Sequence, residues 1–316
     1  MIKVSIIIPL HNGEAFIEET LTSCLNQDQE HLEIIVVENG SKDKSYEVAS
    51  KIKDDRLKLF KIDLPNAAAA RNYGFLQSKG EYITFLDADD ILGSNKIELQ
   101  LSVLQNKPAG WVASCAWAKF NEKVEEAQVK TQRVWKVHEP IDWMVSHLTG
   151  GGMMIPGCWL IPRSVIEKAG LWNESLSLHD DGEFICRVLL ASKGNIFTRN
   201  TLVYYRQVEN SLSRQNFNLA AAKSALKVYK SYTTNLLAVK DNLIIRRALA
   251  HNYRNFIYQF YPNFKALIKE AKHEITNLNV KPVPSVGGEN FKKLANIVGF
   301  NNALRLRVIG RSISKF

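Results

Sequence analysis

Apolar residues in the first 90 positions follow two alternating patterns. Continuous runs of apolar, often β-branched residues, which are typical of buried strands, occupy residues 3–9, 32–37, 57–62 and 82–86. Segments with apolar residues at helical spacing, or with many alanines, occupy residues 14–27, 43–52 and 67–78. Apolar strands separated by helices predict an α/β fold with a mostly parallel sheet and helices on both faces.

The pattern changes along the rest of the chain. Two more helices and two more strands are predicted at residues 94–106, 184–190, 111–119 and 196–205. From about residue 217 the sequence favours helices, which we expect to be interrupted once, by Pro282, Pro284 and Gly287-Gly288. We therefore expect a first domain at residues 1–215 and a helical C-terminal region at residues 216–316.

Composition is that of a globular protein. Of 316 residues, 46% are hydrophobic and 23% are charged, which suits a chain with a sizeable core. We expect neither a transmembrane helix nor a signal peptide, because no long apolar run occurs. The four cysteines form no CxxC pair, so we expect no zinc site and a reducing, cytoplasmic location.

Charge is distributed unevenly along the chain. Residues 217–316 hold 17 of the 41 Lys and Arg residues and 4 of the 32 Asp and Glu residues, a net charge of +13. The first 216 residues consequently carry −4. Such an asymmetry indicates an anionic partner for the C-terminal region, either nucleic acid or anionic lipid.

The last 26 residues resemble a basic amphipathic helix. They contain no acidic residue and six basic ones: Lys292, Lys293, Arg305, Arg307, Arg311 and Lys315. An apolar side is formed by Leu294, Ile297, Val298, Leu304, Val308 and Ile309. Such a helix lies on an anionic bilayer surface, or packs on the first domain with its basic face in solvent, and the sequence leaves both open.

The most informative polar segment is the run DADD at residues 87–90, directly after the predicted strand 82–86. In open α/β sheets, side chains at the carboxyl ends of strands project into the ligand crevice. Carboxylates there suit Mg²⁺ or Mn²⁺, which share phosphate oxygens of a bound ligand. The alternative for this segment alone is a solvated acidic turn.

Two further polar clusters, at residues 9–14 and 38–41, end the first and second predicted strands. Turn chemistry explains each cluster separately. With the strand order 3-2-1-4, however, the first and fourth strands flank the point where a nucleotide binds in such sheets. Three clusters at one edge therefore favour a nucleotide site.

Two other segments contain charged residues that each allow two interpretations when the segment is taken alone. Arg71 either pairs with a phosphate or is a surface arginine on an amphipathic helix. The run HDDGE at residues 179–183 opens the helix that carries Arg187. Its acids either favour the helix start or supply a general base.

Together these segments resemble family 2 glycosyltransferases of the GT-A fold, in the order of that family's motifs over residues 3–214. The matching segments are VSIIIPLHNGEAFIEETLTSCLNQ from residue 4, EIIVVENGSKD from 33, NAAAARNYG from 66, GEYITFLDADD from 80, DDGEFICRVL from 180 and YYRQVENSLS from 204. Three positions depart from the family: Glu38-Asn39 replaces the commoner Asp-Asp, Asp180 replaces a Glu, and Val208 replaces a frequent His.

The resemblance implies a role for each matching residue. Asp181 would be the catalytic base, with Asp180 as the other candidate, and Asp89 would bind the metal. Supporting or acceptor-side roles fall to Glu183, Arg187 and Arg206. Nucleotide contacts fall to Pro9, His11, Asn12, Glu14, Glu38, Asn39, Arg71, Asp87 and Ala88.

The resemblance thus implies an inverting transferase that uses Mg²⁺ or Mn²⁺ and moves a sugar from a nucleotide-sugar, expected to be a UDP-sugar, to a saccharide or lipid-linked hydroxyl. Cell-envelope polysaccharide synthesis is the expected context, and the location is cytoplasmic, peripheral to the inner membrane face if the tail binds lipid. The alternatives are a nucleotidyltransferase and a non-catalytic nucleotide-sugar binding protein. No nucleic-acid partner is expected, because no DNA-binding motif is recognisable.

Overall fold

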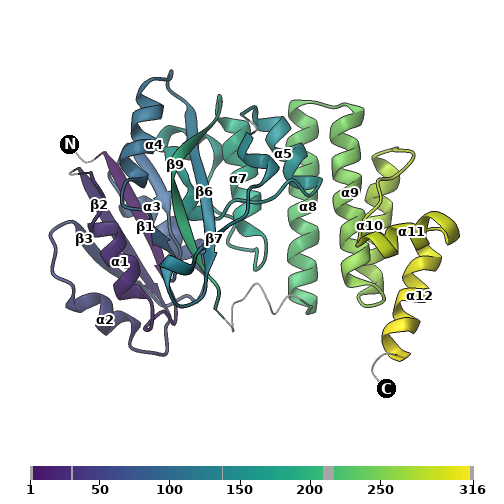
Figure 1. The fold of residues 1–316 in the computed structure, drawn as a ribbon, viewed down its shortest axis with the longest axis horizontal. Coiled ribbons are helices and arrows are strands. Elements are labelled where there is room, and N and C mark those ends of the chain that lie inside the picture. The colour runs from purple at the N-terminus through teal and green to yellow at the C-terminus, as the bar shows by residue number, and fades with distance from the viewer. Residues whose placement is uncertain (1–2, 30, 137, 209–216, 314–316) are drawn as a thin grey trace. The chain divides into compact units, whose positions relative to one another are not determined.

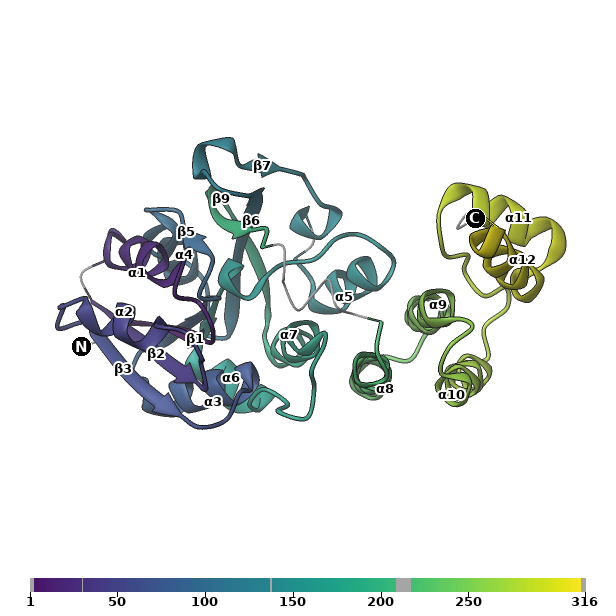
Figure 2. The same ribbon diagram turned by 90° about the horizontal axis from the view of Figure 1, so that it is seen from below.

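The computed structural model describes residues 3–29, 31–136, 138–208 and 217–313 (Figures 1 and 2). The chain folds into two compact units. The first comprises residues 1–147, 151–176 and 180–211, and the second comprises residues 148–150, 177–179 and 212–316. The domain boundary expected near residue 215 lies outside the described residues.

The first unit is built on one mixed sheet. Its strand order is β3-β2-β1-β4-β8-β6-β9-β5, with β7 paired to β6, and the four strands β3, β2, β1 and β4 are parallel. The order 3-2-1-4, on which the expectation of a nucleotide site depended, is therefore present. The strands are β1 Val4–Leu10, β2 Leu32–Asn39, β3 Leu57–Ile62, β4 Tyr82–Phe85, β5 Ile91–Leu92, β6 Trp111–Phe120, β7 Gln128–Val129, β8 Trp159–Pro162 and β9 Gly194–Arg206.

Helices flank the sheet in the first unit and form all of the regular structure described in the second. Figure 2 shows α1 and α3 on opposite sides of the first strands, as a parallel sheet requires. The α-helices are α1 Ile17–Leu25, α2 Ser45–Lys51, α3 Ala67–Gln77, α4 Lys96–Gln105, α5 Pro140–Leu148, α6 Arg163–Ala169, α7 Asp180–Ala191, α8 Leu219–Val239, α9 Leu243–Phe260, α10 Lys265–Asn277, α11 Glu289–Val298 and α12 Phe300–Ile313. The 3₁₀ turns are Val124–Glu126, Arg133–Lys136 and Pro156–Cys158.

Close packing of α3 on the sheet depends on Gly74. A β-carbon at this position would lie 2.5 Å from Ile7 Cγ2 and 3.3 Å from Val37 Cγ2. The helix begins at a capping residue, Asn66, whose side chain accepts a hydrogen bond from the Ala69 N–H at 3.1 Å. Because the helix is held this close, its residue Arg71 is brought to the carboxyl edge of the sheet.

A buried lysine joins the two halves of the sheet. Lys96 is fully buried at the start of α4, and its ammonium donates to Thr84 Oγ1 at 2.9 Å and to the Trp159 carbonyl at 3.2 Å. Burial lowers the pKa of Lys96 to about 8. The side chain thereby links β4, which leads into the DADD segment, to β8.

The second unit consists of helices packed in sequence. Aromatic residues of α8 and α9 form its core, where Tyr229 packs edge-on against Tyr253 and Phe256. The helical structure is interrupted at residues 240–242 and 261–264 as well as near the prolines. The expectation of a single interruption was therefore wrong. Asn242 explains the first of these breaks, because its side chain caps α9 by accepting from the Ile245 N–H.

The C-terminal helices α11 and α12 pack on α9. Phe291 contacts Tyr258 with ring centroids 4.7 Å apart, and the guanidinium of Arg307 lies 3.8 Å from the centre of the Tyr258 ring. Arg254 lies over Phe300 at 4.2 Å. Among the described helices, none is both long enough and apolar enough to cross a bilayer.

Replacement of Gly74 by Val should overpack the contact between α3 and the sheet. We expect a loss of about 3 kcal/mol in the free energy of unfolding, measured by urea denaturation. Gly310→Val is the control, because a β-carbon on Gly310 in α12 meets no described atom within 4 Å. The control should change stability by less than about 0.5 kcal/mol. Equal losses in the two variants would contradict the close packing at Gly74.

Candidate active site

The polar clusters predicted from the sequence meet at one edge of the sheet. Leu10, the last residue of β1, pairs with Glu38 of β2 in a parallel register, and β4 runs parallel to β1 on its other side. The residues that follow these strands therefore leave the sheet at the same edge. Pro9 itself is buried within β1.

The loop after β1 is fixed to the loop after β2. The Asn12 N–H donates to Ser41 Oγ at 3.1 Å, and Asn12 Oδ1 accepts from the Lys42 N–H at 2.9 Å. His11 Nδ1 lies 3.0 Å from the Asn39 carbonyl and must carry the proton, because a carbonyl only accepts. His11 Nε2 then accepts from the Asn12 amide at 3.0 Å.

Glu14 and Asn39 are used within the protein. The Glu14 carboxylate accepts from the Lys44 N–H at 3.0 Å. The Asn39 amide, in the orientation that satisfies both of its polar atoms, donates to the Leu10 carbonyl at 2.8 Å and accepts from the Asn66 N–H at 3.2 Å. Both side chains thus position the loops around the site.

One carboxylate oxygen of Glu38 accepts no hydrogen bond from the described residues. The residue is 2% exposed, and its Oε1 accepts from the Ser41 N–H. Its buried Oε2 has no hydrogen-bond partner among the described residues, and the exposed Lys61 ammonium is 3.8 Å away, beyond hydrogen-bond distance. An unpaired buried acceptor is costly, so Glu38 is suited to a ligand N–H.

Arg71 brings two distant acidic segments together. Its guanidinium donates to Asp87 Oδ1 at 2.7 Å and to Asp180 Oδ2 at 3.1 Å, and it lies 4.4 Å from the centre of the Trp172 ring. Arg71 is 6% exposed, so the alternative of a surface arginine is wrong. Burial disfavours its charge, but Asp87 and Asp180 outweigh this effect and raise the pKa of Arg71.

The two acids at the start of α7 have different surroundings. The helix begins at Asp180, inside the run HDDGE that was predicted to open it, and acidic residues favour a first turn. Burial raises the pKa of Asp180, and the Arg71 charge opposes that shift. Burial also raises the pKa of Asp181, whose carboxylate accepts from the Gly182 N–H at 2.7 Å. No Lys or Arg in the described part of the chain forms an ion pair with Asp181.

The DADD segment is held by polar contacts on two sides. The Ala88 carbonyl accepts from Thr20 Oγ1 at 2.9 Å. Arg206 donates from Nε to the Asp89 carbonyl at 2.9 Å and from its N–H to Asp90 Oδ1 at 3.1 Å. Arg206 also pairs with Glu19 of α1. The backbone of the acidic loop is thus fixed before any ligand binds.

Negative charge accumulates in this loop, although Arg71 pairs with Asp87 and Arg206 lies next to Asp89 and Asp90. Burial, and then the charge of Asp87, raises the pKa of Asp89 to about 6. Burial and the neighbouring acids raise the pKa of Asp90 well above its ordinary range, and Asp90 Oδ2 has no described hydrogen-bond partner.

The donor set fits a divalent cation that completes its shell with ligand oxygens. In the part of the chain that is described, no three His, Cys, Asp or Glu side chains are arranged to hold a metal ion alone. Mg²⁺, however, commonly takes one or two protein carboxylates, with water and phosphate oxygens as its other ligands. Asp89 provides a carboxylate of this kind, next to the charge of Asp87.

Glu183 and Arg187 support the start of α7. They form a bidentate pair within the helix, at 2.9 and 2.8 Å. Arg187 also donates to three carbonyl groups that follow α6, those of Ala169, Gly170 and Leu171, at 2.7, 3.0 and 2.8 Å. The pair therefore holds the turn that carries Asp180 and Asp181.

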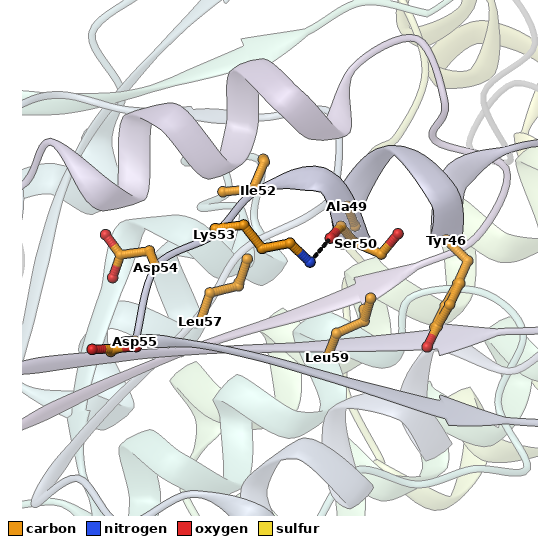
Figure 3. Close-up of a pocket in the computed structure, with 9 residues that line it drawn as sticks. All are labelled: Tyr46, Ala49, Ser50, Ile52, Lys53, Asp54, Asp55, Leu57 and Leu59. Atoms are coloured by element: carbon orange, nitrogen blue, oxygen red, sulfur yellow. Dashed lines mark hydrogen bonds between the residues drawn. The ribbon is translucent and has the colours of Figure 1, made fainter.

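A separate cavity of about 710 Å³ lies between α2 and β3 (Figure 3). None of the predicted site residues lines it. Lys53 in its wall donates to the Ser50 carbonyl at 2.8 Å, and Asp54 is paired with Arg56, which holds the pKa of Asp54 at about 2. Lys53 and Asp54 are therefore used locally, and we place the active site at the sheet edge instead.

The structure adds residues that the sequence did not single out. Trp172 supports Arg71, and Thr20 and Glu19 of α1 fix the acidic loop. No local pattern distinguishes them, because each acts through a contact with a residue far away in the sequence.

A GT-A sheet with an acidic loop after β4 and a second acidic pair at α7 defines a class of sugar transferases. Residues 5–170 match the model of the family described as glycosyl transferase family 2, and the chain belongs to that family. By family it is therefore a glycosyltransferase, the class that the sequence predicted.

Relatives support this assignment. The chain is 45% identical over 107 residues to an uncharacterized glycosyltransferase of Haemophilus influenzae, an alignment that covers 33% of this chain and 43% of the relative. It therefore spans less than half the length of that relative. It is 31% identical over 219 residues to WfaP of Escherichia coli, covering 68% of this chain and 81% of the relative. WfaP is named as a UDP-Glc:alpha-D-GlcNAc-diphosphoundecaprenol beta-1,3-glucosyltransferase.

A solved structure shares the fold. The chain resembles S. aureus TarS 1–349 in complex with UDP-GlcNAc with a TM-score of 0.62 and 16% identity, over 87% of this chain and 89% of that chain. This similarity confirms the GT-A fold predicted from the sequence.

Replacement of Arg71 by Lys tests the bridge between the acidic segments. A lysine has no planar fork to span Asp87 and Asp180, so we expect kcat to fall about tenfold or more. Glycosyl transfer is measured as nucleotide release. Arg163→Lys is the matched control, because Arg163 also lies over a ring, that of Phe75 at 4.7 Å, but away from the acidic loop. Equal kcat losses in both variants would count against the bridge.

Proposed function

We propose that this enzyme transfers a sugar from a UDP-sugar to a hydroxyl group of a saccharide or lipid-linked acceptor, with inversion at the anomeric carbon and with Mg²⁺ or Mn²⁺ as cofactor. The observation that supports this proposal most directly is the Arg71 bridge between Asp87 and Asp180. It brings the acidic loop after β4 next to the acidic start of α7, which supports a site where Asp89 would bind the metal and Asp181 would accept a proton.

Uracil is the base that best suits the environment of Glu38. Its N3–H is a donor, and the buried Glu38 Oε2 is an acceptor that lacks a hydrogen-bond partner among the described residues. Asp87 would lie on the ribose side, and Arg71 would lie near the diphosphate. The neighbouring structure that contains UDP-GlcNAc and the UDP-glucose in the name of WfaP agree with a UDP-sugar.

Asp89 would hold the divalent cation, which when bound supplies positive charge that stabilises the leaving diphosphate. The acidic loop would need such a charge, because Asp87 and Asp89 lie close enough to act on each other and repel phosphate oxygens. Arg206 contributes by fixing the backbone of this loop. The protein thus presents an oriented carboxylate at the edge of the sheet.

Asp181 would accept the proton of the attacking hydroxyl. Asp180 is occupied by Arg71, whereas no described Lys or Arg pairs with Asp181. The raised pKa of Asp181 makes it a stronger base than an ordinary aspartate. The acceptor oxygen forms a bond to the anomeric carbon, its proton passes to Asp181, and the nucleotide leaves with the electrons of the broken bond.

A lipid-linked acceptor is consistent with the name of WfaP, which acts on a diphosphoundecaprenol-linked sugar. We accordingly propose a role in cell-envelope glycan synthesis at the inner face of the cell membrane. The positive charge of the C-terminal region, +13 over residues 217–316, agrees with a location next to anionic lipid.

Asp181→Asn should lower kcat by about 10² to 10⁴-fold while the donor KM stays nearly unchanged, because only the proton acceptor is lost. Asp180→Asn should instead raise the donor KM, because Arg71 loses a partner. Both variants are assayed by nucleotide release from a panel of UDP-sugars with acceptor present. A wild-type kcat in Asp181→Asn would refute its role as the base.

Removal of the metal should weaken donor binding. By calorimetry, UDP should bind the wild-type protein at least about tenfold more weakly in EDTA than in Mn²⁺. Asp89→Ala should bind UDP weakly under both conditions, whereas the exposed Asp142→Ala should behave like the wild type. Equal affinity of the wild type with and without metal would contradict a role for Asp89 in cation binding.

A further inference from the structure

Three large aliphatic side chains lie exposed at the turn between α8 and α9. Val239, Leu243 and Ile244 are 56%, 54% and 65% exposed, whereas Ile245, the next residue, is 1% exposed. Close grouping of exposed aliphatic residues on a soluble surface marks an interaction site. Figure 1 shows this turn at the end of the helix pair opposite the connection from α9 to α10.

Local hydrogen bonds give the turn a fixed shape. Asn242 caps α9 through the Ile245 N–H at 2.9 Å. The Asp241 carboxylate forms a bidentate pair with Arg246, whose Nη1 also donates to the Leu278 carbonyl at 3.0 Å. The aliphatic side chains are therefore presented by an ordered backbone, so less conformational entropy is lost when a partner covers them.

The charges around the turn are basic. Lys240 and Arg247 are exposed beside the aliphatic residues, and the charge of Asp241 is neutralised by Arg246. The other acids of residues 217–316 are also ion-paired: Glu270 and Glu274 with Lys230, and Glu289 with Lys292. Residues 217–316, with a net charge of +13, therefore present no unpaired acid among the described residues that would repel an anionic surface.

We propose that the turn at residues 239–247, called here the helical tip, docks on an anionic bilayer. Aliphatic residues flanked by Lys and Arg match the boundary between acyl chains and anionic headgroups. This inference rests on the proposed function, because docking on a bilayer serves an enzyme whose acceptor is linked to a lipid. An enzyme docked on the bilayer encounters such an acceptor by diffusion in the plane of the membrane.

The helical tip differs from the C-terminal tail, which buries part of its apolar side within the second unit. Leu304 is 1% exposed, and Leu294 and Val298 are partly buried. Ile297, Leu306 and Ile309 remain exposed. These last residues provide a matched control surface in the same unit.

The test is sedimentation of the full-length protein with vesicles of phosphatidylcholine, with and without phosphatidylglycerol, at physiological ionic strength. Wild-type protein should bind only vesicles that contain phosphatidylglycerol. The double variant Leu243→Ser, Ile244→Ser should bind about tenfold more weakly. Lys240→Gln with Arg247→Gln should also weaken binding about tenfold. Leu306→Ser with Ile309→Ser should stay within about twofold of the wild type.

Three results would overturn the proposal: no binding of the wild type to anionic vesicles, wild-type binding by the tip variants, or an equal loss in the tail variant. Capture of the tip by a purified protein partner without vesicle binding would likewise assign it to another class of ligand. Nucleotide release in vesicle-free buffer is measured on the same samples. Nucleotide release should be unchanged in the tip variants. Failure of the vesicle assay alone would therefore contradict docking, and failure of nucleotide release by the wild type would contradict the proposed function.

Discussion

Arg71 lies buried between Asp87 and Asp180, which belong to segments far apart in the sequence, and its guanidinium rests on the Trp172 ring. A buried charge is tolerated only with a partner, so the arginine and the two carboxylates depend on one another. Loss of one partner from such an arrangement typically costs about 3–5 kcal/mol. The same contacts fix the distance between the loop after β4 and the first turn of α7, and the remaining site is arranged around them.

This constraint separates the roles of acids that look alike in the sequence. Asp180 serves Arg71, which leaves Asp181 as the carboxylate available to a substrate. Asp90 receives the Arg206 N–H, whereas Asp89 has its pKa raised to about 6 by burial and by Asp87. A loop with this much negative charge repels a diphosphate unless a cation is present, which is why we propose metal-assisted transfer.

Much of the fold was predictable, because apolar periodicity determines which segments form strands. The strand predicted at residues 57–62 coincides with β3, and the order 3-2-1-4 follows from the way α/β units connect. The burial of Arg71 and Lys96 was not predictable, because it depends on Trp172 and Thr84. The tail shows the same limit, because periodicity identified its apolar side but not the contact of Phe291 with Tyr258 of α9.

A crystal structure of the protein with UDP and Mn²⁺ tests the central claim most directly, because anomalous scattering locates the metal independently of the nucleotide. The account predicts an Mn²⁺ peak bound to Asp89, the diphosphate between that ion and Arg71, and the uracil N3–H directed at Glu38. UDP in the cavity between α2 and β3, or a metal peak remote from Asp89, would contradict it.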